Sequence, residues 1–298
     1  MTSGALASGR ATREGTARFA SGFASLPGHF RCPDVLSVSS LALGTRSGEP
    51  GGVDDLLYRS AVPQCLEGGV NVFATSLSDR LQQSERNLGG ALARAFREGD
   101  VQRDEVVVIS KGGYLTVDPQ AVRNRAAARR YLIETYVETG LVDPASLSHG
   151  VHSLEPGFLR DQIERSRRNL GLATLDYYLL EEPELLLDDT RKQGAEAFRS
   201  GMIRAFEALE EAVDAGHIAA YGLATWDGLL RPHTERNHIA ILDLFDWALE
   251  AGGADHHLRA IQLPYSVAMG EALQLPTQLV PPGGTDAILG ALRDTGTL

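Results

Sequence analysis

The 298-residue sequence has little cysteine, and this scarcity excludes two classes of protein. Its two cysteines, Cys32 and Cys65, lie far apart and form neither a CxxC pair nor a Cys/His ligand spacing. We therefore expect neither a zinc site nor a disulfide-bonded scaffold. A reducing, cytoplasmic location fits this composition best.

Long apolar runs and an excess of positive charge are absent as well. No stretch near the N-terminus resembles the apolar core of a signal peptide, and no later segment approaches transmembrane length. The 28 basic and 39 acidic side chains give a formal net charge of -11, which repels nucleic acid and anionic membrane surfaces. We expect a soluble protein with neither as a partner. Residues 1–27, rich in small residues and arginine, are expected to form a flexible arm before a single domain over residues 28–298.

The sequence does contain short apolar runs that alternate with helical stretches. Such runs are typical of parallel strands covered by helices, and they occur at residues 35–43, 70–75, 106–110, 175–180, 218–223 and 258–263. Between the runs at 175–180 and 218–223, Met202, Phe206 and Leu209 recur at helical spacing, and Gly216 predicts the end of that helix. Alternating strands and helices predict an α/β fold, and right-handed crossovers would curl the sheet into a barrel.

An open, doubly wound sheet is the competing layout. Its usual mark is a GxGxxG sequence after the first strand, and residues 44–48 do not provide one. We therefore favour the barrel. Residues 114–158 form a long insertion, with an amphipathic piece at 131–137, and in a barrel this connection would lie over the mouth where loops bind substrate. A packed decoration on the rim is the alternative.

Several stretches, in order along the chain from about Gly28, resemble the aldo-keto reductases. They are residues 37–45, 68–73, 84–89, 107–111, 164–171, 175–178, 221–226 and 261–265. The resemblance implies a (β/α)8 barrel of the TIM type. It also implies an NADPH-dependent oxidoreductase whose Asp, Tyr, Lys and His meet at the barrel mouth, with the Tyr as general acid.

The sequence departs from that family at three of these four catalytic positions. After the second strand the family reads Asp-Thr-Ala and, three residues on, Tyr, whereas Ala74 and Asp79 stand at the Asp and Tyr positions here. Glu181 replaces the His, and only Lys111 is retained. An ionised carboxylate accepts a proton rather than donating one, so we expect carbonyl reduction by the usual route to be lost.

The cofactor side is altered too. Gln262 matches the residue that holds the nicotinamide amide in the family, and Thr225 and Asp227 stand at polar cofactor-binding positions, with Asp227 replacing an Asn. We interpret these three as relics and expect no cofactor. NADPH would bind only if a reductase activity survives.

The barrel is expected to be incomplete, with about six β/α units. The sequence ends after a helix-like segment at 286–293, where the resemblance places a seventh strand, so the last two strands should be missing. In the family, the loops after those strands grip the cofactor phosphates. Two open edges and an exposed apolar interior favour completion by a second polypeptide or a homodimer over the alternative that the sequence is a fragment.

Asp79, Lys111 and Glu181 follow three successive strands and should project into one mouth. We predict that Lys111 binds an oxyanion or leaving group as a cation, while Asp79 or Glu181 acts as a base. A salt-bridge network without catalytic function is the alternative. A metal site is not expected, although Glu182 would add a third carboxylate.

Four further residues are expected in the substrate pocket. Tyr114 and Trp226 follow strands and should form walls that shape a ligand, Thr75 ends the second strand, and His152 precedes a helix from which it could reach the mouth.

These residues leave three functions open for a protein with a small-molecule substrate. The first is a non-redox acid/base enzyme that catalyses elimination, isomerisation or intramolecular ring closure, in specialised biosynthesis. The second is an NADPH-dependent reductase with a different proton donor. The third is a catalytically inactive subunit of a complex.

Overall fold

In the computed structural model, which describes residues 5–33, 35–188, 194–280 and 283–294, six parallel strands form one sheet in their order along the chain. They are β3 (Ala42–Gly44), β4 (Val72–Ala74), β5 (Val107–Gly112), β6 (Leu175–Glu181), β7 (Ile218–Ala224) and β8 (Leu258–Gln262). The strand order never reverses, as it would in a doubly wound sheet. The sheet is an incomplete (β/α)8 barrel, which confirms the predicted fold class.

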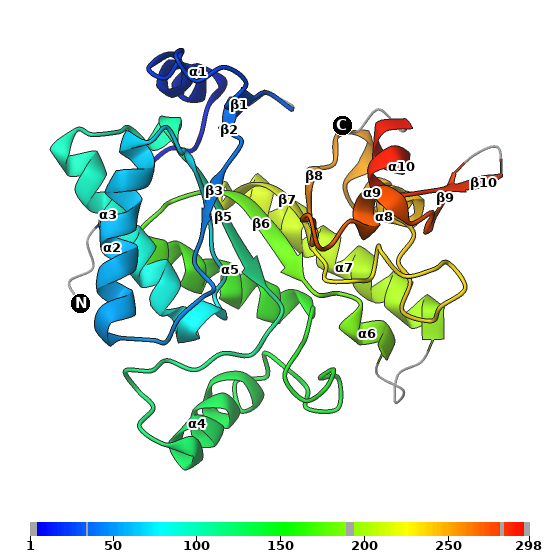
Figure 1. Ribbon diagram of the computed structural model, residues 1–298. Coiled ribbons are helices and arrows are strands. Elements are labelled where there is room, and N and C mark those ends of the chain that lie inside the picture. The colour runs from blue at the N-terminus through cyan, green and yellow to red at the C-terminus, as the bar shows by residue number, and fades with distance from the viewer. Residues whose placement is uncertain (1–4, 34, 189–193, 281–282, 295–298) are drawn as a thin grey trace.

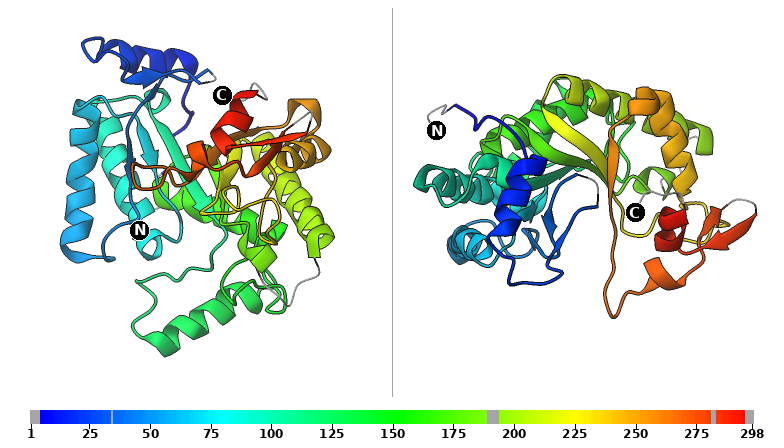
Figure 2. Two further views of the ribbon diagram at one scale, coloured as in Figure 1. Left: turned by 45° about the vertical axis from the view of Figure 1, so that its right-hand side comes forward. Right: turned by 90° about the horizontal axis from the view of Figure 1, so that it is seen from above.

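Five long helices follow the strands and cover the outer face of the sheet (Figure 1). They are α2 (Gly52–Glu67), α3 (Gln83–Glu98), α5 (Pro156–Leu170), α7 (Gly194–Asp214) and α8 (Ile241–Gly252). Seen from above, the strands curve into an open arc with these helices around its outside (Figure 2). The main core fills the space between the two layers, where Ile163 and Phe206 pack with buried strand residues such as Tyr178. No helix of the described residues is long and apolar enough to cross a bilayer.

The register of the strands decides which side chains share the concave face. Lys111 pairs with Leu179 across β5 and β6, so the two side chains point to the same side of the sheet. Glu181 lies two residues beyond Leu179 and therefore points to that side too. Glu181 in turn pairs with Ala224, which pairs with Gln262. The ladder thus gathers Lys111, Glu181 and Gln262 at the carboxyl ends of three strands.

The first predicted strand is wrong in its length. Residues 35–43 form two short strands, because β2 (Val38–Ser39) pairs antiparallel with β1 (Phe30–Arg31) while β3 joins the main sheet. The side chain of Ser39 donates to the Leu41 carbonyl at 2.7 Å, and its backbone N–H donates to the Asn71 side chain at 2.9 Å. These bonds to side-chain partners interrupt the strand between Ser39 and Ala42.

The segment expected to be a flexible arm contains helix α1 (Arg13–Ser21). Thr12 caps the helix by accepting a hydrogen bond from the Gly15 backbone N–H at 2.9 Å. The backbone N–H of Ala11 donates to the buried Asp176 carboxylate at 2.7 Å, and Arg18 forms an ion pair with Glu105 at 2.8 Å. Helix α1 lies at the end of the sheet opposite to the insertion (Figure 1). Polar contacts to distant residues hold this helix, so the local sequence pattern did not predict it.

The long insertion carries helix α4 (Arg125–Leu132), which continues into the π-helical turn η3 (Ile133–Val137). The turn occupies the predicted amphipathic piece, and its Tyr136 is buried in a small separate core with Val142, Leu147 and Phe158. The Tyr136 hydroxyl donates to the Thr116 carbonyl at 2.9 Å, which fixes the insertion to its own first turn. The insertion is thus mainly a packed decoration, and residues 114–116 alone line a mouth cavity.

After β8 the described residues contain no seventh parallel strand. They form α9 (Glu271–Gln274), an antiparallel hairpin of β9 (Gln278–Val280) and β10 (Gly284–Asp286), and α10 (Ile288–Asp294). Helix α10 confirms the predicted helix, whereas the hairpin was not predicted. Within the described chain, β3 and β8 each pair on one side only. The completing second polypeptide or homodimer stays a prediction.

Candidate active site

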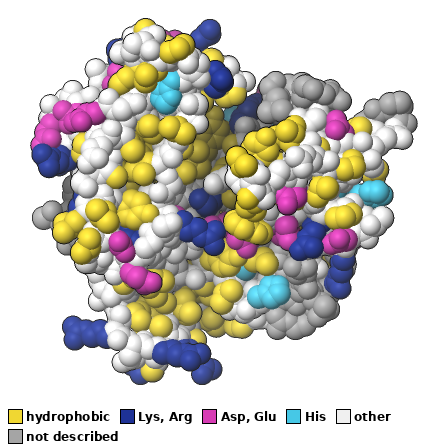
Figure 3. Space-filling model, in the orientation of Figure 1, with side chains coloured by type: hydrophobic (Ala, Val, Ile, Leu, Met, Phe, Trp, Pro, Cys, Tyr) yellow, Lys and Arg dark blue, Asp and Glu magenta, His cyan; other side chains and the backbone are white. Residues whose placement is uncertain are grey.

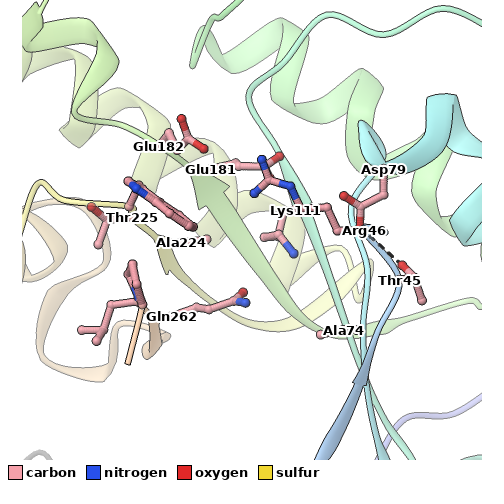
Figure 4. Close-up of a pocket in the computed structure, with 14 residues that line it drawn as sticks. Thr45, Arg46, Ala74, Asp79, Lys111, Glu181, Glu182, Ala224, Thr225 and Gln262 are labelled. Atoms are coloured by element: carbon pink, nitrogen blue, oxygen red, sulfur yellow. Dashed lines mark hydrogen bonds between the residues drawn. The ribbon is translucent and has the colours of Figure 1, made fainter. Parts of the chain in front are cut away.

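A cavity of about 230 Å³ opens at the carboxyl ends of the strands, and Asp79, Lys111 and Glu181 all line it (Figure 4). A second cavity of about 440 Å³ adjoins it, shares Asp79 and Glu181, and adds Tyr114. In the space-filling view, a hollow with many apolar side chains runs between the two halves of the face, and basic and acidic side chains gather at its lower end (Figure 3). The three residues predicted to share the mouth therefore do so.

Lys111 is held by the backbone rather than by a carboxylate. Its ammonium donates to the Thr75 carbonyl at 2.9 Å, and no nitrogen–oxygen distance of 4.0 Å or less joins it to Asp79 or Glu181 in the described structure. No direct salt bridge therefore joins Lys111 to either carboxyl, although its charge lowers the pKa of both against the stronger effect of burial. Since an ammonium carries three N–H donors, two of them remain for other acceptors.

Asp79 is 6% exposed and accepts a hydrogen bond from the Thr45 hydroxyl at 3.3 Å. Burial raises the pKa of its carboxyl, and the positive charge of Lys111 and the Thr45 bond act in the opposite direction. The raised pKa shifts the equilibrium of Asp79 towards its protonated form.

Glu181 is 7% exposed and is held by two hydroxyls from the loop after β4. Its Oε2 accepts from Ser76 at 2.9 Å and from Ser78 at 3.1 Å. Burial raises the pKa of this carboxyl too; Lys111 and the two serines oppose the rise, and the nearby Asp79 adds to it. Two buried carboxyls with raised pKa values and one ammonium therefore line the same cavity.

Arg46 is a mouth residue that the sequence analysis missed. It lines both cavities and is among the residues labelled around the smaller one in Figure 4. Its charge lowers the pKa of Asp79, against the stronger effect of burial. No ion pair of Arg46 is found in the part of the chain that the structure describes. Its position directly after β3, at the mouth of a barrel, was the available signal.

The turn that follows Asp79 has an unusual backbone. Arg80, Leu81 and Gln82 have φ angles of 48°, 55° and 73°, a left-handed conformation that costs non-glycine residues on the order of 1–3 kcal/mol each. Arg80 holds the turn, because its guanidinium contacts Asp55 of α2 at 2.6 Å and the Glu49 carbonyl at 2.6 Å. The position of Asp79 therefore depends on this buried ion pair.

The four predicted pocket residues divide into two groups. Tyr114 and Trp226 line the cavities, and Trp226 is 55% exposed. Thr75 and His152 do not line them, because both side chains are completely buried beneath the mouth. The His152 ring lies 2.7 Å from the Glu181 carbonyl, and the Thr75 hydroxyl accepts from Thr45 at 2.8 Å. The prediction that Thr75 and His152 line the pocket is therefore wrong, since both instead contact residues that do line it.

Tyr114 also reveals a second polar pair at the mouth. Its hydroxyl donates to the Glu182 carboxylate at 2.5 Å. Burial, and then the bond to Glu182, raise the pKa of this phenol, so it stays protonated. A tyrosine hydroxyl is therefore present at the rim, although it is engaged with a carboxylate.

Of the three predicted cofactor relics, Gln262 and Thr225 line the smaller cavity. The Thr225 hydroxyl donates to the buried Glu184 carboxylate at 2.8 Å, which also accepts from the Trp226 backbone N–H at 2.7 Å. Asp227 lies outside the lining and is ion-paired with Arg231.

The sequence between Arg259 and Arg293 is poor in groups that bind phosphate. Phosphate groups are normally held by arginine, lysine or backbone N–H groups, and the sequence has no lysine or arginine between Arg259 and Arg293. Gln262 lines the smaller cavity, and residues 260–292 contain no basic side chain that could hold a phosphate group. No group of three or more potential metal ligands is gathered within the described residues.

Comparisons with known proteins agree with this fold. The sequence matches the aldo/keto reductase family over residues 40–230, which is more than half of the chain. Among solved structures, the glycerol dehydrogenase AKR11B4 from Gluconobacter oxydans is 18% identical with a TM-score of 0.49, over 80% of this chain and 56% of that chain. The aldo-keto reductase AKR11C1 from Bacillus halodurans, in its holo form, is 19% identical with a TM-score of 0.50, over 80% of this chain and 57% of that chain.

The chain thus spans a little over half the length of these two structures. No curated protein matches the sequence. The family match covers the strands and loops that supply Asp79, Lys111 and Glu181. The chain belongs to the aldo/keto reductase family.

Proposed function

We propose that the protein is a non-redox acid/base enzyme that transfers protons on a small molecule bound at the barrel mouth. Elimination, isomerisation and intramolecular ring closure are the reactions that such a site suits. The observation that carries the proposal is the shared cavity of Asp79, Lys111 and Glu181, with both carboxyls buried and neither in contact with the ammonium.

The contacts of the two carboxyls favour different roles. Glu181 accepts two hydroxyl bonds, which stabilise its ionised form and suit a base. Asp79 accepts one long bond and stands where the family has its proton donor, so we assign it the acid role. Base and acid then exchange one proton each with the substrate, and no electron acceptor is needed.

The two cations would stabilise negative charge that develops on the substrate. The Thr75 carbonyl fixes the Lys111 ammonium, so its remaining N–H groups are already oriented when a ligand arrives. Arg46 lines the same cavity and adds a guanidinium that forms no ion pair within the described chain. An oxyanion at an enolate or a leaving oxygen is therefore the group we expect these residues to bind.

A second candidate is an NADPH-dependent reductase in which Asp79 donates the proton. A similar structure bears the name of an aldo-keto reductase, and burial raises the pKa of the Asp79 carboxyl, which favours proton donation from this position. When bound, the nicotinamide would supply a hydride, and Gln262 is the residue that could hold its amide. The lack of lysine and arginine over residues 260–292 counts against this candidate.

Hydrogen–deuterium exchange distinguishes the candidates without knowledge of the natural substrate. A panel of small ketones and aldehydes is incubated with the protein in deuterated water, and NMR follows exchange next to the carbonyl group. We expect exchange without any cofactor and a loss of about 100-fold or more in Glu181→Gln and Lys111→Ala, the usual range for acid/base groups. Asp118→Asn, which alters an ion pair outside the mouth, is the control.

Each outcome points to one function. Reduction of an aldehyde with NADPH, and no cofactor-free exchange, would favour the reductase. Neither activity, in a folded protein, would favour the inactive subunit. Exchange that persists in Glu181→Gln and Lys111→Ala would show that the mouth residues do not carry it.

A further inference from the structure

A separate cavity of about 350 Å³ lies at the amino-terminal end of the strands, away from the mouth. The segment before α1, residues 35–36 and the first residues of β6, β7 and β8 line it. Figure 1 shows α1 at this end of the sheet and the insertion at the other. A ligand here would not touch Asp79, Lys111 or Glu181, none of which lines this cavity.

Three arginines from two distant parts of the sequence line this cavity. Arg10 and Arg13 flank the cap of α1, and Arg259 is the second residue of β8. All three are exposed, and no ion pair holds any of them within the described ranges. Arg259 donates to the Leu258 carbonyl at 2.9 Å, which leaves most of its N–H groups for other acceptors.

The acidic group that lines this cavity does not neutralise the arginines. Asp176 is buried, and its carboxylate accepts from Arg103 at 2.9 Å and from the backbone N–H groups of Ala11 and Val108, both at 2.7 Å. Its charge is therefore balanced inside the fold. His257, the remaining basic lining residue, contacts the Glu210 carboxylate at 2.7 Å.

The cavity thus gathers three uncompensated positive charges on a chain whose formal net charge is -11. Neighbouring guanidinium groups repel one another, and an anion between them relieves this repulsion. Arginine matches phosphate oxygens with paired N–H donors, and a doubly charged phosphate suits several arginines better than a single carboxylate does. Val35, Leu36 and Tyr177 add apolar wall beside the charged groups.

We propose that this cavity binds the phosphate group of a small phosphate ester, with Arg10, Arg13 and Arg259 as its ligands and the apolar wall against the rest of the molecule. The volume lies at the lower end of the roughly 300–1,000 Å³ that small-molecule sites occupy. The site does not depend on the function proposed for the mouth.

Calorimetric titration of the whole chain tests this site, with inorganic phosphate and phenyl phosphate as probes at low ionic strength. We expect saturable binding of both, tighter for phenyl phosphate because its ring can contact the apolar wall. Arg13→Gln and Arg259→Gln should each weaken binding about tenfold, the usual effect of removing one charged hydrogen bond. Arg129→Gln, in helix α4 at the opposite end of the molecule, should bind like the original protein.

Arg46→Gln identifies binding at the mouth, where Arg46 and Lys111 offer a competing pair of cations. Loss of binding in Arg46→Gln, but not in Arg13→Gln and Arg259→Gln, would overturn the proposal. Equal weakening in Arg129→Gln would overturn it as well, since it would reveal attraction to net charge alone. The proposal would also be overturned if neither probe bound saturably at millimolar concentration. Circular dichroism confirms that each variant is folded, and the exposed positions of these arginines make misfolding an unexpected result.

Discussion

Two adjacent glycines in α3 give a matched test of the packing between α3 and α5. A Cβ atom added at Gly89 would lie 2.6 Å from the Leu170 Cα and carbonyl oxygen and 2.7 Å from the Asn169 carbonyl oxygen. A Cβ atom added at Gly90 would meet nothing within 4 Å. The neighbours of Gly89 are backbone atoms, so two whole helices would have to move to make room.

The two substitutions by alanine should therefore change stability in opposite directions. Gly90→Ala should raise the free energy of unfolding by about 0.5–1 kcal/mol, because alanine loses less backbone freedom in a helix. Gly89→Ala gains the same stabilisation from reduced backbone freedom, but it adds a steric cost of about 1–3 kcal/mol, which is typical of an overpacked core. Because the helix term cancels between neighbours, the difference between the two variants isolates the steric cost.

Urea unfolding followed by circular dichroism at 222 nm measures both variants under the same conditions. The midpoint of Gly89→Ala should fall below that of the original protein, and that of Gly90→Ala should rise above it. Equal midpoints for the two variants would refute the close approach of α3 and α5.

Three further predictions concern buried carboxylates. Asp176→Ala removes the partner of the buried Arg103 and of two backbone N–H groups. It should lower the free energy of unfolding, measured with urea, by about 3–5 kcal/mol. Glu98→Ala, which breaks an exposed ion pair, is the control, and an equally small loss in both variants would contradict the prediction. Burial raises the pKa of Glu181, so the folded state binds its proton more tightly than the unfolded state does. That stabilisation is full below the unfolded pKa of about 4.3 and is lost as the pH rises through the folded pKa. The original protein should therefore lose more stability than Glu181→Gln between acid and neutral pH. Urea midpoints that change in parallel for the two proteins would argue against this. Glu184→Ala removes the acceptor of the Thr225 hydroxyl and the Trp226 N–H and should cost about 1–3 kcal/mol, with a change in Trp226 fluorescence that Glu184→Gln should largely avoid; unchanged fluorescence in both would contradict the role of Glu184 in holding this loop.

The alternation of apolar runs predicted the sheet well, because strands buried on both faces have few polar residues to obscure them. All six parallel strands occur within or overlap the predicted runs, and the resemblance placed Asp79, Lys111 and Glu181 at one mouth. The stretches that carry the resemblance are explained in part by packing. Residues 84–89 and 164–171 meet where Gly89 approaches Leu170 and where the Asn169 amide donates to Glu85 at 2.9 Å.

The predictions that failed depend on contacts between residues far apart in the sequence. Helix α1 is held by Asp176 and Glu105, which no local pattern near residue 13 reveals. His152 was expected at the mouth. It is buried because its ring contacts the Glu181 carbonyl of β6, a residue far from it in the sequence. The protonation of buried carboxyls is likewise invisible in a sequence, because desolvation depends on the surrounding fold.

The left-handed turn at Arg80, Leu81 and Gln82 links Asp79 to helix α2. Asp55 lies in that helix, and besides Arg80 it accepts from Asn87 at 2.7 Å and from Gln83 at 3.1 Å. These bonds lower the pKa of Asp55 against the effect of burial, whereas burial raises the pKa of Asp79. The two carboxyls are shifted in opposite directions, so a fall in pH acts on Asp79 before it acts on the ion pair that anchors the turn.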